Sequence, residues 1–187
     1  MTEPIGELTA EEWEAAIEQN RAEKDEFFDE HRQSPIPPDH RDEFDGLQYF
    51  EPDPIYRVEA TVRTEADLPE VDLETSDDRS ITYNRAFRFE FEIDSQSHTL
   101  GGYRRSADDP IFIPFRDKTT GQQTYEGGRY MELEPQEKLR DGDTIIIDFN
   151  LAYSPFCVYS ETFSCPLPPE ENWLETSIEA GERTLEW

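Results

Sequence analysis

The stretch FRFEFEID, residues 87–94, indicates the fold class most directly. Apolar and charged residues alternate along it, in the order Phe87, Arg88, Phe89, Glu90, Phe91, Glu92, Ile93 and Asp94. Successive side chains of a strand point to opposite faces of a sheet, so the alternation predicts a half-buried strand with one face in water. After a short turn at Ser95 and Gln96, residues 98–103 are predicted to return as an antiparallel partner.

Further strands are predicted around this hairpin, at 55–63, 111–115, 129–133 and 144–150. Residues 111–115 are apolar on both faces, which indicates a central strand. The sequence Asp141-Gly142-Asp143 marks a turn between the last two strands. Closely spaced strands separated by turns favour an antiparallel β-sandwich or barrel-like core.

A single helix is predicted at residues 9–33, ahead of these strands. Thr9 followed by Glu12 forms a capping box, and the helix should end before Ser34-Pro35. Residues 34–54 are expected to be an ordered, proline-rich connector. Residues 55–187 then form the β core with a C-terminal extended segment, so residues 1–187 are predicted to make one domain, mainly β and α+β by content.

The charge excludes several classes of partner. The 187 residues carry 45 acidic and 17 basic side chains, a formal net charge of −28. Nucleic acids and anionic membrane surfaces both need cationic partners, so neither is expected to bind. The N-terminus shows no secretory signal and no stretch approaches the length of a membrane span, so we expect a cytoplasmic protein.

The composition also bears on habitat. Twelve Phe, 8 Tyr and 3 Trp argue against a disordered chain. Abundant carboxylates, few lysines and retained arginines are similar to the composition of haloarchaeal proteins, in which concentrated salt screens surface repulsion. An ordinary acidic bacterial protein is the alternative.

The least acidic part of the chain, residues 101–150, contains the strongest candidate site residue. Arg129 shares a strand face with Met131 and Leu133, which predicts an inward-pointing arginine. A buried arginine needs an anionic partner, for which Asp148 is the first candidate and Asp117 the second. The pair is either structural or a clamp in which Arg129 binds a carboxylate or phosphate through two hydrogen bonds.

The two cysteines, Cys157 and Cys165, do not have a standard zinc spacing, and no histidine lies near them in sequence. Two buried thiols are the expected state, with a disulfide as the alternative. A nucleophilic Cys157 would need a base or a lowered pKa. No sequence motif for a metal or a cofactor is present, so neither is expected.

Several segments together resemble the family called domain of unknown function 1684. The resemblance rests on residues 112–121, 124–130, 148–157, 165–169, 171–172 and 178–182, with weaker likeness at Trp13, Arg21, Lys24 and 44–50. Leu151, Ser154 and Trp173 depart from the family pattern. The resemblance implies no known activity, cofactor or partner.

Three functional hypotheses follow. The first is a domain that binds a small polar or anionic ligand at one end of the sheet, lined by Asp117, Tyr125, Arg129, Asp148, Asn150 and Tyr153, with Glu171 and Asn172 at the mouth of the pocket. The second is a hydrolase-type enzyme with Asp117 or Asp148 as general base or Cys157 as nucleophile. The third is a structural or interaction domain. The oligomeric state is left open.

Overall fold

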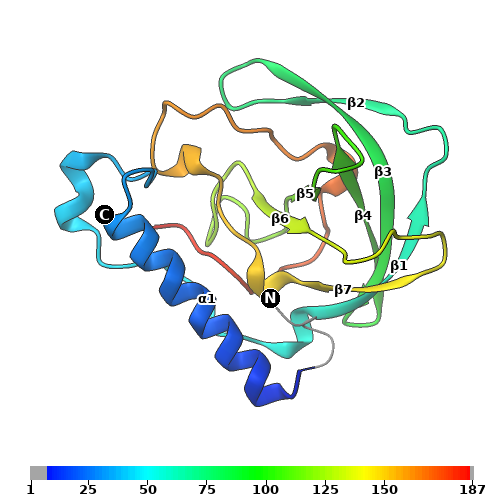
Figure 1. Ribbon diagram of the computed structural model, residues 1–187, viewed down its shortest axis with the longest axis horizontal. Helices are drawn as coiled ribbons and strands as arrows, with labels where there is room; N and C mark the ends of the chain where they lie inside the picture. The colour runs from blue at the N-terminus through cyan, green and yellow to red at the C-terminus, as the bar shows by residue number, and fades with distance from the viewer. Residues whose placement is uncertain (1–7, 186–187) are drawn as a thin grey trace.

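The protein is built on one antiparallel sheet that curves into a half-barrel (Figure 1). The computed structural model describes residues 8–185. Seven strands are present: β1 Arg57–Thr64, β2 Glu70–Glu74, β3 Ser80–Ile93, β4 Gln96–Arg104, β5 Ile111–Phe115, β6 Arg129–Leu133 and β7 Thr144–Asp148. Their order is β6-β5-β4-β3-β1-β7, with β2 paired to the first half of β3. The predicted mainly β fold is confirmed, in its barrel-like form.

The β3–β4 hairpin forms the centre of the sheet. Phe89 lies opposite Leu100, and both are fully buried inside the half-barrel. The hairpin turns through Asp94 and Ser95, one residue earlier than predicted, and both have positive φ. The predicted strand at 111–115 lies between β4 and β6, and its side chains are largely buried on both faces.

The two ends of the sheet have different surroundings. Strands β1, β4 and β6 finish at one end, at Thr64, Arg104 and Leu133; we call this the Thr64 end. The opposite end, here the Arg129 end, holds the start of β6 at Arg129 and the end of β7 at Asp148. Residues near the ends of these strands can therefore be assigned to the Thr64 end or to the Arg129 end.

Helix α1, Ala10–Glu30, begins at the predicted capping box. The Thr9 hydroxyl accepts from the Glu12 amide at 3.2 Å, and the Glu12 carboxylate accepts from the Thr9 amide at 2.9 Å. Trp13, Ile17 and Phe28 bury one face of the helix. A C-terminal segment also lies against α1 (Figure 1) and is joined to it by the ion pair of Lys24 and Glu182. Part of the contact between the helix and the sheet is therefore made through this segment.

Strand β2 and the first half of β3 were not predicted. Residues 70–74 are Glu-Val-Asp-Leu-Glu, and only Leu73 in this strand is buried. An edge strand needs few apolar side chains because one of its sides faces solvent. The acidic composition of residues 70–74 therefore gave no hydrophobic pattern from which this strand could be predicted.

Short 3-10 helices complete the chain: Pro38–Glu43, Pro54–Tyr56, Phe149–Leu151, Phe156–Val158 and Glu170–Asn172. Within the predicted connector at 34–54, Ile36 and Leu47 are buried in a second apolar cluster with Phe28 and Tyr159. Among residues 8–185, no helix is both long and apolar enough to cross a bilayer.

Candidate functional site

Arg129 points inward, as its strand register predicts, and is completely buried. Its guanidinium donates to the carbonyl oxygens of three residues of the C-terminal segment. The Nη2 atom donates to Ile178 O at 2.9 Å, and Nη1 donates to Glu182 O at 3.3 Å and to Ala180 O. Arg129 thus fastens the C-terminal segment to β6.

The anionic partner of Arg129 is Asp117, the second of the two predicted candidates. Its Oδ1 lies 3.6 Å from Nη2 of Arg129. Asp117 also accepts from the Ile178 amide at 2.7 Å and from the hydroxyls of Thr119 and Thr120. Burial lowers the pKa of Arg129, and the charges of Asp117 and Glu182 oppose that lowering. Asp117 and both terminal nitrogens of Arg129 are thus bonded to groups of the protein itself, whereas the buried Nε of Arg129 has no acceptor.

Asp148, the first predicted partner, does not contact Arg129. Ile147 points into the half-barrel, so Asp148 lies on the outer face of β7. There its Oδ2 accepts from the Trp13 indole at 2.7 Å, and its Oδ1 accepts from the Asn150 backbone and side-chain amides. The predicted Arg129–Asp148 pair is wrong because α1 also covers the outer face, so burial of Asp148 does not mean that it points inward.

The remaining predicted residues lie in separate places. The Tyr153 hydroxyl donates to Glu132 at 2.9 Å, whereas Tyr125 is beside Cys157. The Asn172 amide bridges Gly101 on β4 and Pro114 on β5, with hydrogen bonds of 2.7–3.0 Å. These contacts, together with the Glu171 contacts described below, hold loops against the sheet. The contacts join Asp117 to Arg129 and Asp148 to Asn150, but they do not join all eight predicted residues to one another.

A different feature, an open cavity of about 1070 Å³, occupies the Thr64 end. Its walls come from the ends of β1, β4 and β6, from residues 84–87 in the middle of β3, and from the loops at 65–68, 105–110 and 134–141. Most of these residues belong to the least acidic segment, 101–150. Ligand sites are typically concave and of about 300–1,000 Å³, so this cavity is large enough for a small molecule.

Arg104 is the most distinctive residue of the cavity. It shares a face of β4 with Leu100, so it points inward, and its guanidinium lies over the Phe87 ring, 4.8 Å from the ring centroid. Its Nη1 donates to Ala107 O at 2.9 Å, but its buried Nε has no acceptor in the protein. Among residues 8–185, Arg104 forms none of the ion pairs.

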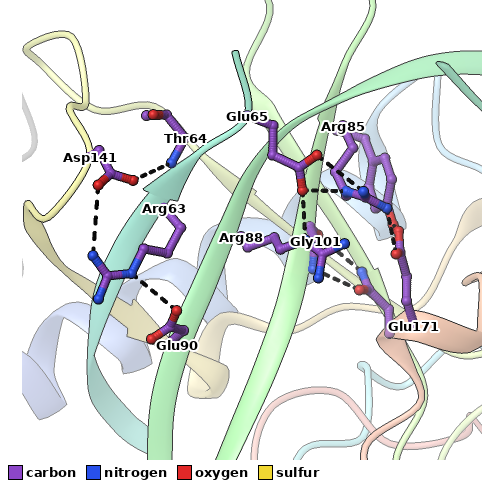
Figure 2. A network of polar contacts seen from close by, with 11 residues as sticks. Arg63, Thr64, Glu65, Arg85, Arg88, Glu90, Gly101, Asp141 and Glu171 are labelled. Atoms are coloured by element: carbon purple, nitrogen blue, oxygen red, sulfur yellow. Dashed lines mark hydrogen bonds and ion pairs between the residues drawn. The ribbon is translucent and has the colours of Figure 1, made fainter. Parts of the chain in front are cut away.

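Glu65, one of the carboxylates that line the cavity, is paired with arginines of the protein. Figure 2 shows Glu65 held by Arg85 and Arg88, at 2.7 Å and 2.6 Å, with Arg85 also bound to Glu171 at 2.6 Å. The Tyr103 hydroxyl also donates to Glu171. Glu65 therefore lines the cavity as one member of a neutralised network.

This network predicts a pH dependence. The hydrogen bond from Arg85, with a smaller one from Arg88, lowers the pKa of Glu65 against the opposing effect of burial. A carboxyl with a lowered pKa in the folded state stabilises above its unfolded pKa and loses that contribution as the pH falls through the folded value. Glu65→Gln should therefore lose less stability than the wild type between about pH 5 and pH 3.

The measurement is the urea unfolding midpoint across this range at constant salt. Glu137→Gln, on the same cavity rim, is the matched control and should keep the wild-type pH dependence. Equal acid sensitivity of Glu65→Gln and the wild type would contradict the assignment of this effect to Glu65.

The fold and its buried cluster define a class of protein: an antiparallel half-barrel with a C-terminal segment fastened across one end and a cavity at the other. The chain belongs to the family described as protein of unknown function DUF1684, whose sequence model matches residues 42–183. The predicted resemblance is therefore confirmed. Among residues 8–185, no three His, Cys, Asp or Glu side chains are grouped to hold a metal ion.

The chain is similar to an uncharacterised protein of Haloarcula marismortui whose structure was solved by NMR in solution. The two share 63% sequence identity over 93% of this chain and 95% of that chain, with a TM-score of 0.75. No curated protein matches the chain.

The sequence hypotheses did not include Arg104 or the loops around it. Two signals pointed toward them. Residues 101–150 are the least acidic segment, and Arg104 follows Leu100 at even spacing, which predicts the same inward face as the core.

Proposed function

We propose that the protein binds a small organic anion with an apolar body in the cavity at the Thr64 end. The observation that carries this proposal is the buried Nε–H of Arg104, which lines the cavity and has no acceptor in the protein. A buried donor without a partner costs free energy, and an anionic oxygen from a ligand would remove that cost.

Arg104 is the feature that supports an anionic ligand, in a wall that carries six carboxylates and four cationic side chains. Burial lowers the pKa of Arg104, and the charge of Asp109 opposes that lowering. The Asp109 carboxylate accepts from the Ser106 amide at 3.0 Å, and that of Asp141 accepts from the Thr64 amide at 3.0 Å. These two carboxylates accept from the backbone, whereas the Nε donor of Arg104 has no acceptor in the protein.

The apolar part of the ligand would lie on Phe87 and its neighbours. The wall carries the side chains of Leu68, Ala86, Phe87, Pro110, Leu133 and Leu139. Each buried methylene of a ligand contributes about 0.8 kcal/mol. An aliphatic or aromatic carboxylate fits this combination of an arginine and an apolar wall.

The proposed ligand belongs to the class that the sequence predicts, but the proposed site lies at the Thr64 end of the sheet instead of the Arg129 end. At the Arg129 end, the guanidinium is completely buried, and both of its terminal nitrogens donate to the protein's own carbonyl groups. Its Nε also has no acceptor, but Arg129 does not line the cavity. Asp117 and Asp148, the predicted general bases, are likewise engaged by donors of the protein. Ligand binding at the Thr64 end is thus better supported than hydrolysis at either aspartate.

Arg104→Gln tests the proposal through the binding of octanoate, measured by isothermal titration calorimetry at fixed salt. A hydrogen bond to a charged group contributes about 1.5–3 kcal/mol, so the affinity should fall roughly 10- to 100-fold. Octanol, which has the same apolar chain and no carboxylate, should bind weakly to both proteins.

Arg116→Gln is the matched control, since Arg116 also lies over an aromatic ring, that of Trp173, but near the Arg129 end. It should bind octanoate as the wild type does. Equal loss in both variants, or no binding of octanoate to the wild type, would contradict the proposal.

We further infer a salt-rich cytoplasm as the working environment. The inference is supported by the net charge of −28 and by the haloarchaeal source of the similar solved structure. Binding should therefore be compared at matched high salt.

A further inference from the structure

The two cysteines, 157 and 165, lie together although they are not bonded. Both are free thiols, and their side chains are within hydrogen-bonding range of each other. Cys157 belongs to the short 3-10 helix Phe156–Val158 and is partly exposed, whereas Cys165 is only 8% exposed. Cys157 is therefore the more exposed of the two residues, and Cys165 is the buried one.

The backbone on both sides of the pair is held in place. The Ser76 amide donates to Cys165 O at 2.9 Å, and the Cys165 amide donates to Ser76 Oγ at 3.1 Å. The loop between the cysteines is closed by an edge-to-face contact of Phe156 and Phe163, with ring centroids 5.3 Å apart. Tyr159, in the same loop, donates to the buried Glu182. The backbone at Cys165 is therefore held by Ser76, and the loop that carries Cys157 is held by the contacts of Phe163 and Glu182.

Polar neighbours favour the thiolate form of Cys157. A hydrogen bond from Cys165, followed by those of Ser76 and Tyr125, lowers the pKa of the Cys157 thiol, although burial opposes this. The pKa of Cys165 is raised by the same contact and by burial. Tyr130 also faces the pair. The two thiols thus have different roles available to them: Cys157 as the nucleophile and Cys165 as the proton-bearing partner.

We propose that Cys157 and Cys165 form a dithiol site that hydroperoxides oxidise to an intramolecular disulfide. The inference is independent of the proposed ligand site, since none of these residues lines the cavity.

The chemistry proceeds in two steps. The Cys157 thiolate attacks one oxygen of hydrogen peroxide; an S–O bond forms, the O–O bond breaks, and the departing hydroxide takes up a proton to become water. The Cys165 sulfur then attacks the Cys157 sulfenic acid; the S–S bond forms, the S–O bond breaks, and the hydroxyl leaves as water with the proton of Cys165. Overall, two thiols are oxidised to one disulfide, and one peroxide is reduced to two waters.

The test treats the reduced, full-length protein with hydrogen peroxide and follows thiol content and intact mass. The wild type should lose both thiols together and the mass of two hydrogen atoms. Peptide mapping of the product should join residues 157 and 165 within one chain. Linkage between chains, or oxidation of Cys157 to sulfinic acid with Cys165 still free, would overturn the proposal.

Single variants separate the two roles. Cys165→Ser should stop at a sulfenic acid on Cys157, which dimedone traps. Cys157→Ser should react at least about tenfold more slowly near pH 7, because each pH unit between two thiol pKa values changes the thiolate fraction about tenfold. Equal rates for the two variants would overturn the assignment.

Tyrosine variants supply a second readout. Tyr125→Phe should slow oxidation, since Tyr125 hydrogen-bonds to the Cys157 side chain. Tyr153→Phe removes a hydroxyl that bonds to Glu132 and should keep the wild-type rate. Circular dichroism identifies any variant that fails to fold, and the wild-type peptide map then decides the question by itself.

Discussion

Arg129→Met is expected to lower the free energy of unfolding by roughly 3–5 kcal/mol, the usual cost of removing one partner from a buried ion pair. The substitution leaves the buried Asp117 carboxylate without its cation, 3.6 Å away, and removes the donors to the carbonyl oxygens of Ile178, Ala180 and Glu182. Urea unfolding at constant salt, followed by tryptophan fluorescence, measures the change.

Arg79→Met is the control for losing an arginine that has a carboxylate partner. Arg79 lies on the surface, 2.7 Å from Asp77, and its side chain is 70% exposed. Surface ion pairs contribute little, so the unfolding midpoint should hardly move. If both variants lost the same stability, Arg129 would not be the buried anchor of the C-terminal segment.

Gly181→Ala should be the second most destabilising change. Gly181 lies between two of the Arg129 acceptors and has φ of +78°, a left-handed conformation that costs other residues about 1–2 kcal/mol. An alanine Cβ there would lie 2.6 Å from Ala152 O and 2.8 Å from Phe149 O, so the backbone would have to move. That movement weakens the hydrogen bonds from Glu182 N to Ala152 O and from Phe50 N to Gly181 O, each contributing about 0.5–1.5 kcal/mol.

Gly121→Ala separates conformational strain from displacement of the segment. Gly121 has φ of +81°, but an alanine Cβ at this position would meet no atom within 4 Å. It should lose only the cost of the left-handed backbone, about 1–2 kcal/mol, and Gly181→Ala should lose at least about 1 kcal/mol more. Equal losses, measured by urea unfolding, would show that the position of the C-terminal segment is not tightly fixed.

The strand pattern in the sequence was sufficient to predict most of the sheet. Residues 87–94 and 111–115 place apolar side chains where the core needs them, so periodicity alone identified their strands. Strand β2 was missed because its only buried side chain is Leu73, and the rest of its stability comes from pairing with β3. Backbone pairing of this kind leaves no signal in hydropathy.

The inward direction of Arg129 was predictable for the same reason, since it follows from the two-residue period of a strand. Its acceptors were not predictable, because they are backbone carbonyls about fifty positions further along the chain, and a carbonyl has no residue-specific signature. Asp148 was assigned to the wrong face because α1 covers the outside of β7, which the residue pattern of β7 alone does not reveal.

The cavity could not be predicted from the sequence for a related reason. Its wall is assembled from the ends of three strands, the middle of β3 and three loops, none of which carries a motif. Only the three-dimensional register brings the Arg104 guanidinium over the Phe87 ring and leaves its Nε without an acceptor. The charge distribution indicated the segment that holds most of this wall, and the structure places Arg104 in the wall.

We propose that the two ends of the half-barrel have different roles: Arg129 fastens the C-terminal segment at one end, and Arg104 binds the ligand at the other. A titration of ¹⁵N-labelled protein with octanoate, followed by amide NMR shifts, distinguishes the two ends. We predict progressive shifts at Ala86, Arg104 and Leu139 and little change at Asp117, Arg129 and Ile178. Shifts confined to the second group would place the ligand at the Arg129 end and contradict this division of roles.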